Sequence, residues 1–296
     1  MTDALIAGIE LGGTKGVALI ARGSDIIDQL RVPTTRPAET LGILSDWLKE
    51  QHEKMPFAAL GIASFGPLCL DRTSPDYGFI TQTPKAGWSN SNVIGAFSSW
   101  FNGAIEFDTD VNGAALAEER WGAAQGCAVH IYLTIGTGVG GGVVVNGAPV
   151  HGAVHSEMGH VRVRRVAGDA FEGICPFHGD CLEGLVSGPA LAARTGMAGT
   201  SLTSDHPIWH KVAEEIAELM ATLILTVSPQ RIVIGGGVGM GQGALFPMIR
   251  DATAAKLNGY VSGLGRGSLD KLIVPPALGE RAGPLGVIAL GLRALT

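Results

Sequence analysis

The sequence is poor in charged residues and has no excess of positive charge. Asp, Glu, Lys and Arg make up 16% of the 296 positions, and the formal net charge is -6. No run of Lys and Arg supplies the basic surface that nucleic-acid binding requires, so we expect no nucleic-acid partner. The densest basic stretch, Arg162–Arg165, includes a valine and predicts a strand with one solvated face.

Long apolar runs are missing as well. No stretch of the sequence approaches the roughly 18 apolar residues that a membrane span needs. The first residues, Met1-Thr2-Asp3, lack the positively charged start of a signal peptide. We therefore expect a cytoplasmic protein without a membrane partner.

Cysteine is scarce, and glycine is abundant. The cysteines are Cys69, Cys127, Cys175 and Cys181. In a reducing compartment, the close spacing of the last two favours a metal site over a disulfide, and we interpret the first two as small buried apolar residues. Glycine occupies 44 positions, about twice its usual share of roughly 7%. We interpret its clusters as places where the backbone approaches a ligand closely.

The pattern of apolar segments predicts an α/β protein, and a hydrophobic content of 46% allows a sizeable core. The expected strands are residues 4–9, 16–21, 60–64, 105–108, 129–135, 143–145 and 231–234, and the expected helices are residues 38–53, 111–121, 211–226, 245–257 and 283–295. We expect two similar lobes, residues 1–110 and 111–282, with the C-terminal helix (283–296) packing back on the first.

A strand–glycine turn–strand hairpin occurs twice. The first turn is Glu10-Leu11-Gly12-Gly13-Thr14-Lys15, and the second is Gly136–Gly142. This repeat indicates a weak internal duplication. Backbone amides in such turns, together with the hydroxyl of Thr137, suit anionic oxygens, so the pair predicts phosphate binding. For either hairpin taken alone, a tight turn without a ligand is the alternative.

Residues 136–141 also match the G-x-G-x-x-G pattern of dinucleotide-binding proteins. That fingerprint requires a helix after the glycines, so that the helix N-terminus meets the pyrophosphate. Here Val143-Val144-Val145 follows and predicts a strand instead. The context therefore favours the phosphate-binding hairpin over the dinucleotide site.

Two further segments are candidates for nucleotide contact. Gly235-Gly236-Gly237-Val238-Gly239 follows an expected strand and precedes a helix, so backbone there can lie against a base or ribose. Ser187-Gly188-Pro189-Ala190 predicts a helix start, whose N-terminus suits an anionic ligand. An ordinary strand-to-helix turn is the alternative for each.

Phosphoryl transfer to a hydroxyl requires a group that orients and deprotonates that hydroxyl. Asp110 is our candidate, at the junction of an expected strand and an expected helix. An aspartate in this place also suits a helix N-cap, and the spacing does not separate the two roles.

Three potential metal ligands, Cys175, His178 and Cys181, lie within seven residues. His160 can supply a fourth ligand, and the resulting Cys2His2 set is typical of structural zinc with no open position for chemistry. His151 and His155 compete for the fourth position. A buried thiol pair beside unrelated histidines is the alternative to a metal site.

Taken together, these residues resemble the ROK family (repressors, open reading frames and kinases), and within it the bacterial fructokinases. The resemblance covers essentially the whole chain. Its most specific part is Glu157-Met158-Gly159-His160, followed by Cys175, His178 and Cys181 and by Leu182-Glu183-Gly184. The first glycine turn and Asp108-Thr109-Asp110-Val111-Asn112 also match.

The resemblance implies an actin-like ATPase (ribonuclease H-like) fold with two similar lobes and a cleft that closes on sugar and Mg-ATP. It implies a homodimer, and it implies that Asp110 is the catalytic base. By the same resemblance the sugar contacts are Asp110, Glu157, His160 and Glu183, and the zinc ligands are His160, Cys175, His178 and Cys181. The implied ATP contacts are Gly12, Gly13, Thr14, Lys15, Thr137, Gly138, Pro189, Gly235, Gly236, Gly237, Val238 and Gly239. We expect Glu10 to hold the water shell of Mg²⁺.

The chain departs from the general family pattern at Glu10 and Thr109, where the family has aspartate and asparagine. Both residues resemble the fructokinase branch, as does the segment 79–85, so fructose is the expected substrate and its 6-hydroxyl the expected acceptor. Mannose and glucose remain open as substrates, as does a non-catalytic sugar-sensing role. A repressor of this family would carry an N-terminal helix-turn-helix domain, for which the early first strand leaves no room.

Overall fold

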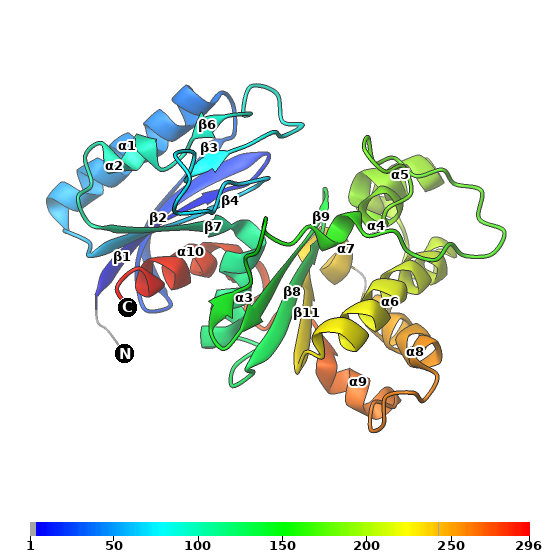
Figure 1. Ribbon diagram of the computed structural model, residues 1–296. Helices are drawn as coiled ribbons and strands as arrows, with labels where there is room; N and C mark the ends of the chain where they lie inside the picture. The colour runs from blue at the N-terminus through cyan, green and yellow to red at the C-terminus, as the bar shows by residue number, and fades with distance from the viewer. Residues whose placement is uncertain (1–3, 242) are drawn as a thin grey trace. The chain divides into compact units, whose positions relative to one another are not determined.

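Two five-stranded sheets form the framework of the chain (Figure 1). The computed structural model describes residues 4–241 and 243–296. It divides into unit 1, made of the chain up to Gln125, Pro149–His155 and Glu280–Thr296, and unit 2, made of Gly126–Ala148 and Ser156–Gly279. Each sheet begins with a β-hairpin and continues with parallel strands. This arrangement confirms the mixed α/β class and both predicted hairpins.

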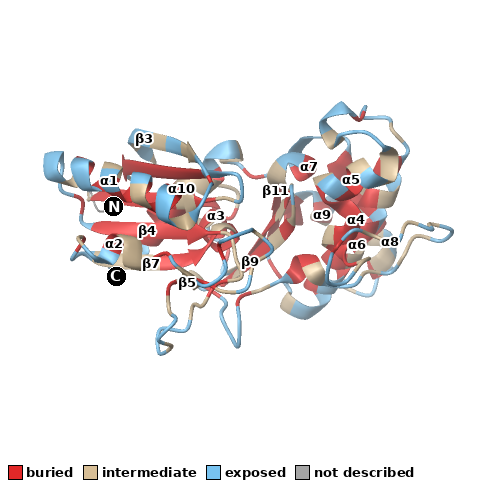
Figure 2. Ribbon diagram, turned by 90° about the horizontal axis from the view of Figure 1, so that it is seen from above, coloured by how far each residue is buried: buried red, intermediate tan, exposed pale blue. Residues whose placement is uncertain are grey.

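The sheet of unit 1 has the order β3-β2-β1-β4-β7. Its strands are β1 (Leu5–Leu11), β2 (Lys15–Arg22), β3 (Asp25–Pro33), β4 (Ala59–Ser64) and β7 (Ala104–Thr109), and its helices are α1 (Pro37–Lys54), α2 (Gly95–Ser98), α3 (Asp110–Trp121) and α10 (Ala282–Arg293), with a small ribbon of β5 (Phe79–Ile80) and β6 (Ser91–Asn92). β1 is buried on both faces, which explains its unbroken apolar sequence. Figure 2 shows its neighbour β4 as buried along its length.

Alternate residues of β1 face two different helices. Leu5, Ala7 and Ile9 belong to one apolar cluster with Leu44 of α1. On the other face, Gly8 lies against Val287 of α10 so closely that a Cβ there would be 2.1 Å from a side-chain carbon. The C-terminal helix therefore packs directly on the sheet of unit 1.

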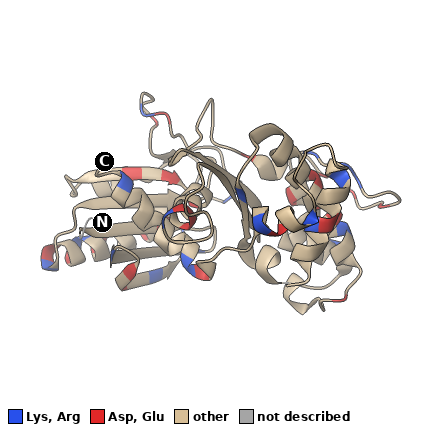
Figure 3. Ribbon diagram, turned by 90° about the horizontal axis from the view of Figure 1, so that it is seen from below, with Lys and Arg blue, Asp and Glu red and all other residues tan. Residues whose placement is uncertain are grey.

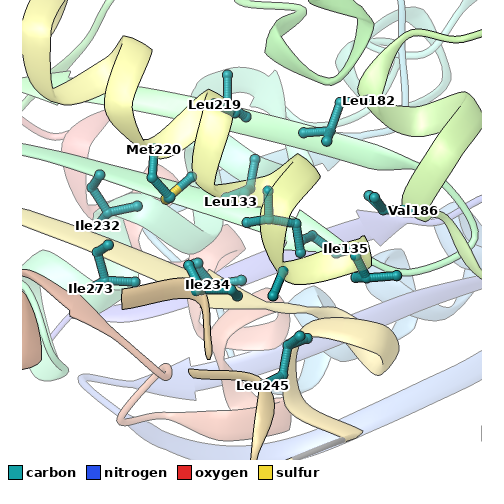
Figure 4. Packing of buried hydrophobic residues seen from close by; sticks show 14 of the residues in the cluster. Leu133, Ile135, Leu182, Val186, Leu219, Met220, Ile232, Ile234, Leu245 and Ile273 are labelled. Carbon is teal, nitrogen blue, oxygen red and sulfur yellow. The ribbon is translucent and has the colours of Figure 1, made fainter. Parts of the chain in front are cut away.

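The sheet of unit 2 has the order β10-β9-β8-β11-β12. Its strands are β8 (Val129–Ile135), β9 (Val139–Val145), β10 (Ala148–Pro149), β11 (Arg231–Gly235) and β12 (Ile273–Val274), and its helices are α4 (Leu182–Val186), α5 (Gly188–Thr195), α6 (Ile208–Val227), α7 (Gly236–Gly241), α8 (Leu245–Leu257) and α9 (Arg266–Leu272). Figure 4 shows the core, where Leu133 and Ile234 of the sheet lie among Leu182, Leu219 and Leu245 of the helices. Short 3₁₀ turns occur at Met158–His160, Gly199–Ser201 and Gly279–Arg281.

Two local predictions were wrong. Arg162–Arg165 is not a strand, since Arg162 makes only an isolated bridge to Cys181. The third glycine cluster begins at the last residue of β11, as expected, and the rest of it lies in the short helix α7. The second glycine turn is shorter than expected, because β9 already begins at Val139.

The division of the chain also differs from the expected one at residue 110. Helix α3 lies in unit 1 together with α10, which contacts it. Gly113 and Gly286 let the two helix backbones approach, since a Cβ on Gly286 would lie 2.5 Å from the backbone of Gly113. The first boundary between unit 1 and unit 2 therefore lies between Gln125 and Gly126. Among the described residues, no helix is both long enough and apolar enough to cross a membrane.

Candidate functional site

The junction of β7 and α3 carries Asp110. Thr109, in extended conformation, is the N-cap of α3, and its hydroxyl accepts a hydrogen bond from the backbone N–H of Asn112 at 3.2 Å. Asp110 is the first residue of the helix, half-buried, and its Oδ1 accepts from the N–H of Val111 at 2.9 Å. The capping alternative for Asp110 is therefore wrong, because Thr109 caps the helix.

Asp108 is a residue of this junction that the sequence interpretation missed as a site residue. Its side chain is 2% exposed, and its Oδ1 accepts hydrogen bonds at 2.7 Å from both the N–H of Thr109 and the side-chain amide of Asn112. The ring nitrogen Nε2 of His151 lies 3.0 Å from the other carboxylate oxygen. The hydrogen bond to Asp108 raises the pKa of His151, against the opposing effect of burial. The motif that contains Asp110 signals Asp108, but no pattern in the sequence signals His151.

The first glycine turn is exposed at its tip, Gly13 and Thr14. The N–H of Gly12 donates to the carbonyl of Lys15 at 2.9 Å, and the hydroxyl of Thr34 donates to the carbonyl of Gly12 at 2.8 Å. Lys85 places its ammonium group 2.5 Å from the carbonyl of Gly13. This cation, which comes from the segment that resembles the fructokinase branch, gives the turn a positive charge suited to an anionic ligand.

Glu10, at the end of β1, lies against the start of α10. A Cβ on Gly283 would come within 2.4 Å of its carboxylate. Burial raises the pKa of Glu10, although the positive charges of Lys15 and Arg31 act in the opposite direction. Carboxylate oxygens are among the ligands of Mg²⁺, which usually keeps several of its waters.

The second glycine turn brings the other nucleotide-contact candidates of unit 2 together. The N–H of Gly188, at the start of α5, donates to the carbonyl of Gly136 at 2.7 Å. Gly136 also lies beside Gly237, since a Cβ on the former would be 3.8 Å from the backbone nitrogen of the latter. Ser187 caps α5, so Pro189 occupies the first turn of the helix as predicted. Thr137 is exposed at the tip of the turn.

Glu183 lies beside this turn, and the carbonyl of Glu157 accepts from the N–H of the potential metal ligand His160 at 3.0 Å. The Oε2 of Glu183 accepts from the N–H of Val139 at 2.9 Å and approaches Gly138. Glu157 is exposed and precedes the 3₁₀ turn that contains His160. That turn packs tightly on β9, because a Cβ on Gly159 would lie 1.8 Å from the carbonyl oxygen of Val139. The glycine of this motif is therefore required by packing.

The ligand atoms of His160, Cys175, His178 and Cys181 all lie within 4.8 Å of one another. The Sγ–Nδ1 distances are 3.7 Å from Cys175 to each histidine and 3.6 Å from Cys181 to His160. A tetrahedral zinc with bonds of about 2.3 Å to sulfur and 2.0–2.1 Å to nitrogen would separate S and N ligands by about 3.6 Å. The donor set therefore fits zinc in both chemistry and spacing.

The competing histidines are engaged elsewhere. His151 binds Asp108, and the Nε2 of His155 accepts from the N–H of Leu68 at 3.0 Å. Burial is the main cause that raises the pKa of the Cys181 thiol to about 11. The thiol therefore keeps its proton unless a cation displaces it.

A cluster of charged side chains supports the metal-ligand loop and α5. Arg194 is buried and donates to both oxygens of the buried Glu215 at 2.7 and 2.9 Å, and it also binds Asp169. Arg165 joins Asp169 to Asp180, which lies between two of the metal-ligand candidates. Figure 3 shows both signs of charge on the same helices of unit 2, as expected for such pairs.

Comparison with known proteins gives a consistent result. The model of the ROK family matches residues 6–294 of the chain. A fructokinase of Zymomonas mobilis is 46% identical over 97% of this chain and 96% of its own length, and a fructokinase of Pediococcus pentosaceus is 42% identical over 98% and 99%. The crystal structure of a ROK hexokinase from Thermus thermophilus aligns with a TM-score of 0.79 at 25% identity, covering 98% of this chain and 99% of that one.

Proposed function

The chain belongs to the ROK family, and from this premise we propose that it transfers the γ-phosphoryl group of ATP to the 6-hydroxyl of D-fructose. It is a sugar kinase with the two-lobed actin-like ATPase fold, and fructose 6-phosphate is its product. The observation that carries the choice of fructose is the similarity to fructokinases over nearly the full length of both chains.

In this proposal Asp110 accepts the proton of the sugar hydroxyl as it attacks the γ-phosphorus. The carboxylate stands at the first position of α3, where Thr109 supplies the N-cap, so capping does not require the side chain of Asp110. Because phosphoryl transfer needs little covalent chemistry from the protein, most of the rate should come from positioning and from stabilisation of phosphate charge.

In this proposal the two glycine turns stabilise the negative charge of the ATP phosphates. Gly12, Gly13, Thr14 and Lys15 form the first, and Thr137 and Gly138 form the second, next to Pro189 and the segment 235–239. Backbone amides there would donate to phosphate oxygens. Mg²⁺, when bound with ATP, neutralises phosphate charge, and Glu10 would hold its water shell. The charge near Gly13 supports adding Lys85 to the phosphate-binding residues.

Glu157, His160 and Glu183 are the proposed sugar contacts in unit 2. His160 would also be a ligand of a structural zinc, together with Cys175, His178 and Cys181. The S–N distances of 3.6 to 3.7 Å support this assignment. When bound, zinc would hold the loop that leads into α4, at the start of which Glu183 lies.

We also propose a cytoplasmic homodimer without nucleic-acid or membrane partners. The scarcity of positive charge supports the absence of a nucleic-acid partner. The free thiols of Cys175 and Cys181, spaced closely enough to bind a metal, support a reducing compartment.

The test is ADP release by the purified protein with Mg-ATP and separate hexoses, each at about 1 mM, a typical upper KM. We expect turnover on fructose well above that on mannose and glucose. Turnover on another hexose alone would keep the mechanism and change the substrate. If no hexose stimulates ADP release while sugar still binds, a sensing role replaces the catalytic one.

A further inference from the structure

The segment Pro149–His155 belongs to unit 1, although the residues on both sides of it belong to unit 2. We call it the histidine strap, because His151 and His155, near its two ends, contact Asp108 and Leu68 elsewhere in unit 1. His151 and His155 also face each other in an isolated antiparallel bridge, so the strap turns back on itself. The ring of His155 is buried and accepts from the N–H of Leu68 at 3.0 Å.

His151 binds the junction that carries Asp110. Oδ1 of Asp108 accepts two hydrogen bonds from that junction, one from the backbone N–H of Thr109 and one from the side-chain amide of Asn112. Nε2 of His151 lies 3.0 Å from Oδ2 and 3.2 Å from Oδ1, so it covers the second oxygen. Since the carboxylate can only accept, Nε2 carries the hydrogen. A carboxylate that is 2% exposed needs such a partner, because an unpaired charge there would be costly.

The bonds to Asp108 determine the shape of the junction. Asp108 ends β7, and Asn112 lies in the first turn of α3, so one carboxylate holds residues on both sides of Asp110. A shift of Asp108 would therefore move the first turn of the helix. Displacement by about 1 Å is enough to slow a reaction by about a hundredfold when geometry limits the rate.

We propose that His151 is a positioning residue for phosphoryl transfer, which acts by fixing the Asp108 carboxylate and through it the turn that holds Asp110. This role rests on the proposed kinase function. His151 touches no reacting atom in it.

The charges around His151 make the role dependent on pH. The hydrogen bond to Asp108 is the largest effect on the pKa of His151 and raises it, whereas burial lowers it. The negative charges of Asp108 and Glu106 also raise the pKa of His151, and the positive charge of Arg293 lowers it. The net direction is upward. The ion pair is therefore complete below the ordinary histidine pKa, 6.5, and weakens to a neutral hydrogen bond as the pH rises through the raised value.

The experiment compares His151→Ala, His151→Gln and His155→Ala with wild type in the ADP-release assay with fructose. We expect His151→Ala to lower kcat by on the order of tenfold or more, with the KM for ATP changed by less than about twofold. His151→Gln, whose amide still donates to Asp108, should recover most of the rate and make the kcat profile flatter above pH 6.5. His155→Ala is the matched control, because it frees the strap at its other end.

Two results would overturn the proposal: an unchanged kcat in His151→Ala, or an equal loss in His155→Ala, which would indicate general loosening of the strap. Wild type without turnover on any hexose would remove the kinase function and the positioning role together. Titration of the His151 imidazole by NMR tests the pairing without relying on turnover. If His151 pairs with Asp108, Asp108→Asn lowers the pKa of His151 whether or not the protein is a kinase. An unchanged pKa there would exclude the pairing.

Discussion

Asp110 and Asp108 lie two residues apart and have different surroundings. Asp108 is buried and fully engaged with Thr109, Asn112 and His151, whereas Asp110 is half-buried at the helix start. Spacing alone left the cap and the base as equal roles for Asp110. The threonine at position 109 decides the cap, because its extended backbone and short hydroxyl side chain satisfy the N–H of Asn112.

Asp110→Asn should therefore remove catalysis and leave the fold intact. The amide cannot accept the hydroxyl proton, and general-base loss typically costs about 10²–10⁴-fold in rate. We expect kcat to fall by that amount, with ATP affinity measured by calorimetry within about threefold of wild type. A variant that keeps a tenth of wild-type turnover would remove Asp110 from the role of base.

Asp169 binds three cations, Arg165, Arg194 and Lys211. Burial raises the pKa of its carboxyl, but the bonds to Lys211, Arg194 and Arg165 outweigh that effect and lower it to about 2. Because the folded pKa lies below the ordinary 3.8, the stabilisation is present above pH 3.8 and is lost as the pH falls to about 2.

Asp169→Asn should accordingly be less stable than wild type at pH 7, and the difference in free energy of unfolding should shrink below pH 4. Urea denaturation at several pH values measures it. Asp270→Asn is the control, since the side chain of Asp270 is 56% exposed in its pair with Arg250 and the pair should contribute about 0–1 kcal/mol. A difference that stays constant between pH 7 and pH 2 would contradict the linkage.

At the scale of elements, the glycines have two uses. The glycine turns have exposed tips at Gly13, Thr14 and Thr137, but other glycines serve packing. Gly61 of β4 is an example, because a Cβ there would lie 1.9 Å from the carbonyl oxygen of Val287 and 2.5 Å from the backbone nitrogen of Gly291. The interpretation of glycine as a sign of ligand binding was too narrow, since close helix–sheet packing uses it as well.

Gly61→Ala should be strongly destabilising. The new methyl group would meet backbone, which cannot rotate away, so we expect a loss of about 3 kcal/mol, the upper end of typical overpacking. Thermal unfolding measures it. Gly42→Ala, in α1 with open space around the new methyl, should instead gain up to about 1 kcal/mol from helix propensity. Equal stability of the two variants would show that α10 does not pack as described.

At the scale of the whole molecule, each unit has its own apolar core. The cluster of unit 1 includes Ile9, Leu44 and Trp88, and that of unit 2 includes Leu133, Leu182 and Met220. The four potential zinc ligands all belong to unit 2. Loss of metal should therefore loosen one unit and spare the other.

Cys175→Ser, or chelation of wild type, should raise amide exchange around residues 160–186 and leave the sheet of unit 1 unchanged. We expect a lower Tm and a higher KM for fructose, because Glu183 follows the loop directly. Hydrogen-exchange mass spectrometry locates the change, and Cys69→Ser in unit 1 is the matched control. Full activity in protein shown by elemental analysis to lack zinc would refute a supporting role for the metal.

Features that depend on neighbours along the chain could be predicted from the amino-acid sequence. Both hairpins form, although β9 begins earlier than predicted, and the helix at residues 245–257 has the predicted bounds, because glycine turns and apolar periodicity are local. Cys175, His178 and Cys181 also lie close together for a local reason, since a loop of seven residues can hardly separate them.

Contacts between residues far apart in the chain could be learned only from the folded structure. It selected His160 over His151 and His155 as the fourth member of the metal set, paired His151 with Asp108, and put α3 beside α10 in unit 1. The partners in these contacts are 43 residues apart for Asp108 and His151. Their meeting depends on how sheets and helices pack, and no periodicity or spacing within a segment encodes it.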